Sequence, residues 1–439
     1  MDNSINGKIK INDQNNISGQ INILSKEPFS DRNGLSIFAN MKKIDLNDFT
    51  KLFENNSSKN KIFFSESKIN FEEIKVGGII LNRLDTQISP SKKGLKLSLY
   101  SNELKGNVLY NYEDNLLVGR FNKLIINNKN KYGQTQDKNE FQDSSKPFKI
   151  DIKFDEFILD EKSYGSLNLL AERQNQNWLI NNFTLTNPFH TFSADGNWQN
   201  KDGVDKTSLN FKWRIEDLEQ TLNQLGHPNL VRKGEARING IANWDESPFN
   251  FSPDQFTGTF SMDLKKGEIL EAEPGIGRLF GLLTLQNLPK RLSLDFSDLF
   301  SKGFIYDTIS AGVRMNLGIL SSNNFKMMGP AAEVNMDGEV DIIKETQNIH
   351  VIVRPYVSDS LSLAALAGGP LAGAAAFIAQ KILKDPLNKV LTDEYQITGT
   401  WDEPVETDKP KSEELSKLVD EEIIEPSGDI LDKLNIFKK

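Results

Sequence analysis

Residues 332–354 read AEVNMDGEVDIIKETQNIHVIVR, and this stretch decides the fold class. Apolar residues alternate with polar ones from Val334 to Ile342 and again from Ile349 to Val353. A period of two places successive side chains on opposite faces of the backbone, so each run predicts a β-strand with one apolar face. The segment between the two runs is short and polar, which is typical of a hairpin connection.

The same alternation recurs along most of the chain, for example from Leu209 to Ile215. The connections are short, and no regular exchange of strand and helix patterns indicates a parallel α/β sheet. The chain is therefore predicted to be mainly β, as one long antiparallel sheet with a few capping helices. Further apolar runs lie at residues 5–11, 17–23, 35–41, 79–81, 95–99, 108–110, 152–154, 167–169, 183–185, 192–194, 236–241, 256–264, 292–296, 313–319 and 395–399.

Local signals in the middle of the chain predict one turn and one helix. Asp195-Gly196 is a dipeptide typical of tight turns, so we expect a hairpin turn there. Asp217 is a favourable N-cap, and Gln220 follows it three residues later as in a capping box. A short helix is therefore expected near 217–226, covering one end of the sheet.

Composition excludes several classes of function. The chain has 439 residues, of which 38% are hydrophobic, and this is lean for a large globular core. An elongated sheet with one buried face per strand fits that value. The net charge of −9 argues against a nucleic-acid partner, since phosphate binding needs clustered Lys and Arg. The absence of cysteine excludes thiol catalysis, disulfides and Cys-ligated zinc.

The two ends of the chain carry no recognisable targeting or membrane segment. The first residues, MDNSINGKIKIND, lack an apolar signal core and enter a strand pattern almost at once. No run has the length and hydropathy of a membrane span. We therefore expect this chain to be the C-terminal part of something longer.

Four segments are similar to one known family. The most specific is EPGIGRLFGLLTLQNLPKRLSLDFSDLFSKGF at 273–304, followed by MMGPAAEVNMDGEVDI at 327–342 and AQKILKDPLNKVLTDEYQITGTWDEP at 379–404. A weaker match is WLINNFTLTNPFHTFSADGNW at 178–198. These segments resemble the C-terminal region of the YhdP family, in the AsmA-like superfamily of Gram-negative envelope proteins. The resemblance spans most of residues 1–404.

The resemblance implies a fold and a function. Members of the family are long twisted antiparallel sheets folded into an elongated open groove with an apolar inside. An N-terminal helix anchors them in the inner membrane, and they cross the periplasm to move phospholipid toward the outer membrane. This chain is therefore expected to be the C-terminal part of a periplasmic lipid-transfer protein, with the anchor segment missing from it. Its expected partners are phospholipid and the inner leaflet of the outer membrane, or a protein there.

Three regions are expected on this basis. They are residues 1–265, an antiparallel β-groove segment with the short helix; residues 266–404, an AsmA-like end of the groove with helices near 274–285 and 361–392; and residues 405–439, a charged and mobile tail.

Alternating strand residues are the candidates for contact with lipid. Each acyl methylene in water costs about 0.8 kcal/mol, so a continuous apolar strip would lower the barrier to carrying a lipid across water. The alternative is that the same residues fill a dry β-sandwich core. A register slip of one residue would invert every assignment. The candidates are Phe211, Trp213, Phe256, Phe260, Met262, Leu294, Met315, Leu317, Val334, Met336, Val351 and Val353.

The run Ser360–Gln380 contains no charged residue. It is interpreted as an apolar helical tip that touches the outer membrane or a partner there. A helical hairpin that plugs the end of the groove is the alternative, because small residues permit close helix packing. Candidate membrane-contacting residues are Leu361, Leu363, Leu366, Leu371, Phe377 and Ile378.

No catalytic, metal or cofactor site is expected. The histidines at 190, 227 and 350 are scattered and lack ligand-like spacing. Asp295 and Asp298 are spaced so that a strand would place them on opposite faces, which argues against an acid pair. Among non-enzymatic functions, the alternative to lipid transfer is an envelope assembly scaffold that pairs an exposed β-edge with a client strand.

Overall fold

The computed structural model describes residues 5–7, 17–24, 34–45, 66–76, 79–126, 148–175, 177–201, 204–248, 252–270, 304–330, 332–356 and 392–408. The chain divides into two compact units. Unit 1 comprises Met1–Asp217 and Arg237–Phe260, and unit 2 comprises Leu218–Ala236 and Ser261–Lys439. The region boundary expected at residue 265 stays a prediction. The helices expected near 274–285 and 361–392 lie outside the described residues, apart from the last residue of the second range.

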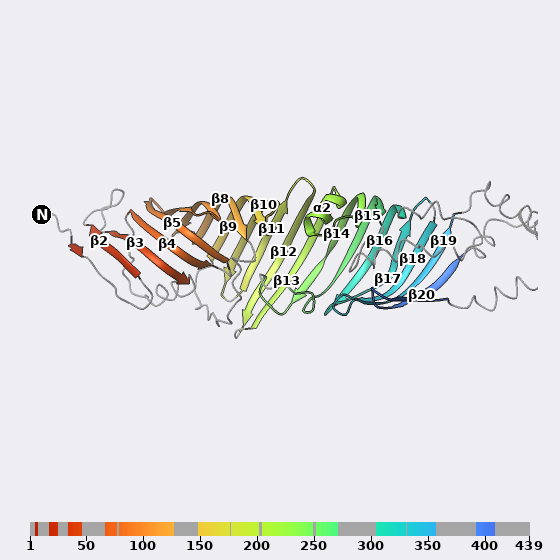
Figure 1. The fold of residues 1–439 in the computed structure, drawn as a ribbon. Helices are drawn as coiled ribbons and strands as arrows, with labels where there is room; N and C mark the ends of the chain where they lie inside the picture. Colours follow the sequence, from red (N-terminus) through yellow and green to blue (C-terminus); the bar gives the residue numbers. More distant parts are fainter. Residues whose placement is uncertain are drawn as a thin grey trace, which may run out of the picture. The chain divides into compact units, whose positions relative to one another are not determined.

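Unit 1 consists of β-strands that lie side by side in chain order (Figure 1). It also holds Arg237–Trp244 of β14 (Val231–Trp244) and Thr257–Phe260 of β15 (Thr257–Ile269), and the other residues of these strands belong to unit 2. The strands are β1 (Ile5–Gly7), β2 (Ile17–Leu24), β3 (Gly34–Asp45), β4 (Ser67–Val76), β5 (Ile79–Ser91), β6 (Gly94–Tyr100), β7 (Leu104–Asn111), β8 (Leu116–Ile126), β9 (Phe148–Leu159), β10 (Lys162–Gln174), β11 (Asn177–Thr186), β12 (His190–Lys201) and β13 (Val204–Ile215).

Strand pairing in unit 1 is antiparallel with two exceptions. β3 pairs with β4 in parallel, and β8 pairs with β9 in parallel. The predicted mainly β fold with a long, largely antiparallel sheet is confirmed, and these two parallel pairs are local departures from it. A parallel pair needs a long connection that returns the chain to the same end of the sheet, and residues 46–66 and 127–147 supply it. The two parallel pairs delimit the antiparallel blocks β4–β8 and β9–β13.

The turn expected at Asp195-Gly196 is wrong, because both residues lie inside β12. Gly196 pairs with Leu209 on one side and Ile180 on the other. Its φ is 156°, and a Cβ there would lie 2.1 Å from the carbonyl oxygen of Ser208. The glycine therefore permits close approach of neighbouring strands, which is a common reason for glycine within a sheet.

One buried hydrophobic cluster of unit 1 lies over β4–β8. Leu104 and Val108 of β7 are an even number of residues apart, as the period of two requires, whereas Leu81 and Leu84 of β5 are three apart, with Arg83 between them at a φ of 51°. Phe121 stacks on Phe154 of β9, with ring centroids 4.8 Å apart. The buried residues are Ile74, Leu81, Leu84, Leu104, Val108 and Phe121.

Unit 2 contains one described helix and a second set of strands. Helix α2 spans Leu218–Leu225, begins directly after the N-cap candidate Asp217, and buries Leu218 and Thr221. None of the helices in the described part of the chain is long and apolar enough to cross a membrane. The strands that lie wholly in unit 2 are β16 (Phe304–Asn316), β17 (Ile319–Met328), β18 (Ala332–Asp341), β19 (Thr346–Pro355), β20 (Asp393–Gly399) and β21 (Pro404–Asp408).

The strands from β16 to β21 form an antiparallel series in chain order. β18 and β19 are the hairpin that the sequence of 332–354 predicts. β21 extends to Asp408, where a mobile tail is expected, because Pro404–Asp408 pairs with Tyr395–Gly399 of β20. Among the described strands β21 pairs only with β20, so the sheet of this unit is open.

Candidate functional site

Strand register aligns apolar side chains of unit 1 into three rows that cross the sheet from β5 to β13. We call these rows the apolar face. Neighbouring strands are about 4.8 Å apart, so the face is about 40 Å long across the strands. The rows are Thr86, Leu99, Gly106, Phe121, Phe154, Leu167, Leu185, Phe192 and Trp213; Ile88, Leu97, Val108, Gly119, Ile152, Leu169, Phe183, Ala194 and Phe211; and Pro90, Leu95, Tyr110, Leu117, Ile150, Ala171, Ile180, Gly196 and Leu209.

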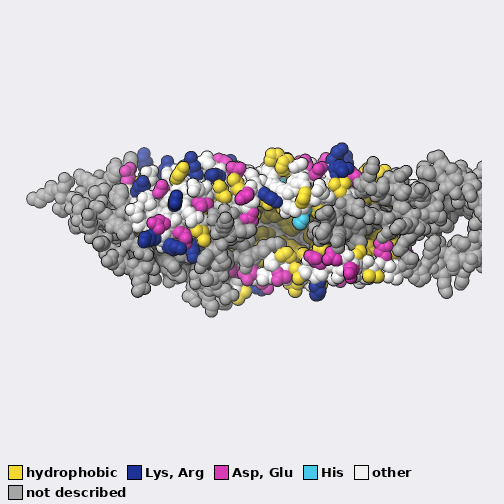
Figure 2. Space-filling view, viewed as in Figure 1, with side chains coloured by type: hydrophobic (Ala, Val, Ile, Leu, Met, Phe, Trp, Pro, Cys, Tyr) yellow, Lys and Arg dark blue, Asp and Glu magenta, His cyan; other side chains and the backbone are white. Residues whose placement is uncertain are grey.

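Solvent exposure varies along this face. In its first part, over β5–β8, Val108 and Phe121 are buried at 9% and 7% exposure, whereas the other large side chains, such as Leu97, Leu99 and Leu117, are half-buried. Over β9–β13 most of its large side chains remain half-buried: Phe154, Leu167, Leu169, Phe183, Leu185, Phe192, Phe211 and Trp213. Hydrophobic side chains gather in a hollow over β12 and β13, and charged side chains lie along its rims (Figure 2). Apolar surface therefore remains accessible to a ligand in the second part.

Aromatic contacts hold the centre of the accessible part. The ring of Phe192 lies 6.1 Å from that of Phe211, 6.1 Å from that of Trp213 and 6.2 Å from that of Phe183, centroid to centroid. Such pairs contribute about 0.5–1.5 kcal/mol each beyond their buried area. These contacts therefore fix the positions of the rings, although the rings remain partly exposed to solvent.

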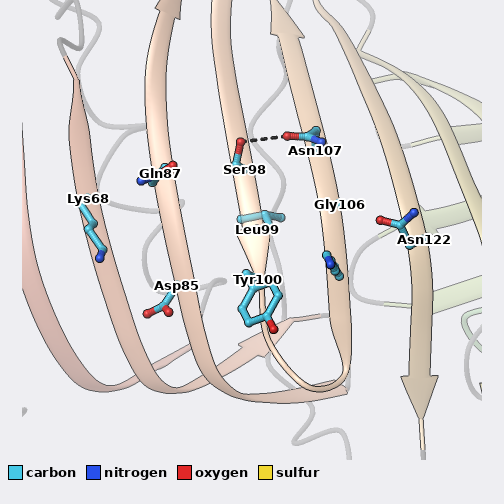
Figure 3. Close-up of a pocket in the computed structure, with 10 residues that line it drawn as sticks. Lys68, Asp85, Gln87, Ser98, Leu99, Tyr100, Gly106, Asn107 and Asn122 are labelled. Carbon is cyan, nitrogen blue, oxygen red and sulfur yellow. Dashed lines mark hydrogen bonds between the residues drawn. The ribbon is translucent and has the colours of Figure 1, made fainter.

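The other side of the same strands is polar. Leu170, adjacent to Leu169 in β10, is 42% exposed on that side, and Arg120 forms an ion pair with Asp151 at 2.8 Å. Over β4–β8 this polar side holds a shallow pocket of about 340 Å³ (Figure 3). Its lining includes Lys68, Asp85 and Tyr100. Among the described residues, no group of three or more His, Asp or Glu side chains can hold a metal ion.

The structure distributes the candidate lipid-contacting residues over several environments. Phe211 and Trp213 lie on the accessible part of the apolar face. Phe260 and Met262 are half-buried residues of β15, and Phe256 is a buried residue directly before that strand. The candidate Leu294 and all the membrane-contacting candidates, which lie within 361–378, fall outside the described residues and stay predictions.

Five candidates share one face of unit 2. Met336 of β18 pairs with Val351 of β19, Val334 pairs with Val353 in the same hairpin, and Met315 lies on β16. Val334 and Val353 have 0% exposure, and Val351 has 1%. Side chains with so little exposure are close-packed, so contact with a ligand there would require neighbouring atoms to move.

Leu317 does not lie on a strand face. β16 ends at Asn316, and Leu317 and Gly318 form the turn to β17 with φ angles of 50° and 86°. Leu317 is 57% exposed. Its assignment to the lipid-contacting strip stays a prediction, although the alternation of apolar residues that suggested it continues through a position where the chain reverses.

Sequence reasoning missed most of the accessible surface. Leu167, Leu169, Phe183 and Phe192 are recognisable as strand residues, but only the register shows that they align with Phe211. A usable signal was the density of aromatic residues within 178–198.

Two comparisons with known proteins find relatives of this chain. The family model described as "YhdP protein" matches residues 1–406. The "Intermembrane phospholipid transporter YhdP" of Escherichia coli (strain K12) is 32% identical over 230 residues, which are 50% of this chain and 18% of that protein. The matched part thus spans less than a fifth of this relative, and no solved structure matches the chain. Since the family model covers nearly the whole chain, this protein belongs to the YhdP family.

Proposed function

We propose that this chain is part of a lipid-transfer protein that carries phospholipid between the inner and outer membranes of the envelope. The observation that carries the proposal is the accessible part of the apolar face over β9–β13, where aligned apolar side chains remain half-buried. The printed function of the E. coli relative, intermembrane phospholipid transport, supports it. An envelope scaffold is not favoured, because neither comparison points to one.

The energetics fit acyl chains as the occupant. Moving a two-chain lipid through water exposes many methylenes at about 0.8 kcal/mol each. The apolar face offers contact with apolar side chains from one strand to the next, so successive positions along it are similar in chemistry. A ligand that is held without a deep local minimum can move along such a surface.

The same reasoning leads us to propose where this protein acts. A protein that shields lipid in water is needed in the aqueous space between two membranes, which is the periplasm. Its ligand is phospholipid, and the membranes that donate and accept the lipid are its other partners.

The test compares two adjacent residues of the same type on opposite sides of β10. Leu169→Lys places a charge on the apolar face, whereas Leu170→Lys places it on the exposed polar side. Lipid bound to the purified chain after mild extraction would be measured by mass spectrometry for both variants and the unmodified protein. We expect phospholipid with the unmodified protein and with Leu170→Lys, and much less with Leu169→Lys. Equal lipid in both variants, or none in the unmodified protein, would refute the proposal.

A further inference from the structure

Five aromatic rings form a continuous series along one edge of the apolar face. The ring of Tyr110 contacts those of Tyr112 and Phe148 at centroid distances of 5.4 and 6.2 Å. The ring of Phe148 lies 6.2 Å from that of Trp178, which stacks on Trp198 at 6.4 Å. We call these five residues the aromatic rim. They come from β7, β9, β11 and β12 and from the residue that follows β7.

The aromatic rim lies where the apolar rows end. Phe148 is the first residue of β9, and Trp178 is the second residue of β11. Trp178 pairs with Trp198 across β11 and β12, two residues beyond the pair Ile180 and Gly196 of the third row. The rim is therefore the boundary between the apolar face and the turns at this edge.

The rim carries polar groups at its outer side. The Trp198 Nε1 donates a hydrogen bond to the Asp205 carboxylate at 2.7 Å, and the Tyr110 hydroxyl donates one to Asn115 Oδ1. Trp and Tyr with an apolar body and a hydrogen-bonded tip are typical of surfaces that are apolar on one side and wet on the other. In membranes the same residues concentrate at the level of the lipid head groups.

A cationic side chain lies beside the aromatic rim. Arg173 of β10 pairs with Phe148 and with Trp178, and its Cζ lies 6.0 Å from the centre of the Trp178 ring. Arginine binds phosphate through a fork of N–H donors and also stacks on aromatic rings. Its position in this row places a phosphate-binding group directly beside the apolar rows.

The opposite edge of the same strands has different chemistry. There the turn between β9 and β10 consists of Asp160 and Glu161, and two aromatic contacts lie near this edge, Phe157 with Tyr164 and His190 with Trp213. Carboxylates lie at both edges, since Asp205 bonds Trp198 at the rim, so the edges differ in the continuous series of rings and in Arg173, which attracts a phosphate. The two edges are therefore not equivalent for a phospholipid.

We propose that a phospholipid bound to unit 1 lies in one orientation, with its acyl chains on the apolar face and its glycerol–phosphate region at the aromatic rim. This orientation rests on the proposed function, since it presumes that the ligand is a phospholipid. Arg173 pairs with the phosphate, and Trp178 and Trp198 lie at the level of the glycerol esters.

The test uses the absence of cysteine from the chain, which allows single cysteines to be labelled with a fluorophore. Asn177→Cys reports on the aromatic rim and Lys162→Cys on the opposite edge, and both positions are exposed. β10 alone spans about 40 Å between these edges, which is too far for one quencher to reach both sites. The full chain would be loaded from phosphatidylcholine vesicles that contain lipid with a nitroxide either on the head group or in the middle of an acyl chain.

We expect the head-group nitroxide to lie about tenfold more often at the Asn177 site than at the Lys162 site, which corresponds to about 1.4 kcal/mol. Arg173→Gln and the double variant Trp178→Leu, Trp198→Leu should bring the ratio close to one. Tyr100→Leu, which alters an exposed aromatic residue on the polar side of the sheet, should leave it unchanged. If the double variant does not fold, Arg173→Gln alone gives the answer.

The outcomes separate the two proposals. If the acyl-chain nitroxide does not quench the tryptophan fluorescence of the unlabelled protein, no lipid occupies the apolar face and the proposed function fails. If it does quench, but the head-group nitroxide reaches both edges equally or favours the Lys162 site, lipid binding stands and the single orientation is overturned. An unchanged ratio in Arg173→Gln would show that Arg173 does not bind the lipid phosphate.

Discussion

Truncating two phenylalanines of the same row will distinguish an accessible apolar face from a dry core. Phe121 and Phe192 belong to one row of unit 1, but Phe121 is 7% exposed whereas Phe192 is half-buried. A fully buried Phe→Ala change costs about 3–5 kcal/mol because it loses both transfer energy and packing. Phe121→Ala should reach that range. Phe192→Ala should cost about half as much, roughly 2 kcal/mol, because water already reaches part of the ring.

Urea unfolding followed by tryptophan fluorescence gives both values, since Trp178, Trp198 and Trp213 report on unit 1. Saturating phospholipid should raise the free energy of unfolding of the unmodified protein, because a ligand that binds only the folded state stabilises it. That increment should shrink in Phe192→Ala and persist in Phe121→Ala. A loss of 3–5 kcal/mol in both variants, with no effect of lipid, would refute the accessible face and leave a dry core.

Four further predictions concern unit 2 and are checked by urea unfolding. Gly267→Ala should cost about 1–3 kcal/mol because its Cβ would lie 2.3 Å from the Tyr306 hydroxyl, which is buried and has no hydrogen-bond partner among the described residues. Burial raises the pKa of Tyr306 to about 12, so the folded state prefers the protonated phenol. The free energy of unfolding should therefore fall as pH rises from about 10 through 12, and Tyr306→Phe should abolish that fall. Leu317→Asn should add up to about 1 kcal/mol, since Asn tolerates a φ of 50° better than Leu, and a loss would contradict the assigned turn. Hydrogen bonding, first from Asn335, lowers the pKa of Glu333. The ionised carboxylate therefore stabilises the folded state above about pH 4.3, and this stabilisation is lost as the pH falls below that value. Glu333→Gln should lose less stability on acidification than the unmodified protein.

Short-range sequence pattern predicts the individual strands well. The alternation in 332–354 corresponds to β18 and β19, and the capping pattern at Asp217 precedes α2. Both follow from local geometry, because side chains alternate along any strand and a cap satisfies backbone groups of its own helix. The family was recognisable for a similar reason, since its motifs are contiguous stretches of sequence.

Local pattern fails where the chain changes direction or partner. Leu317 continues an apolar alternation, but the backbone turns there. Asp195-Gly196 has the composition of a turn, but β12 continues through it because Gly196 fits between two neighbouring strands. The parallel pairs β3–β4 and β8–β9 depend on how the segments at 46–66 and 127–147 return the chain, which no local pattern encodes.

The sequence by itself determined that this protein is a mainly β member of the YhdP family with one apolar side to each strand. Only the tertiary structure decided which apolar residues form a buried core and which stay accessible. Phe121 and Phe192 have the same side chain in the same row, yet one is buried and the other is half-buried. The physical reason is that alternation fixes the side of the strand on which a residue lies, whereas its exposure depends on what strands far away in the sequence place around it.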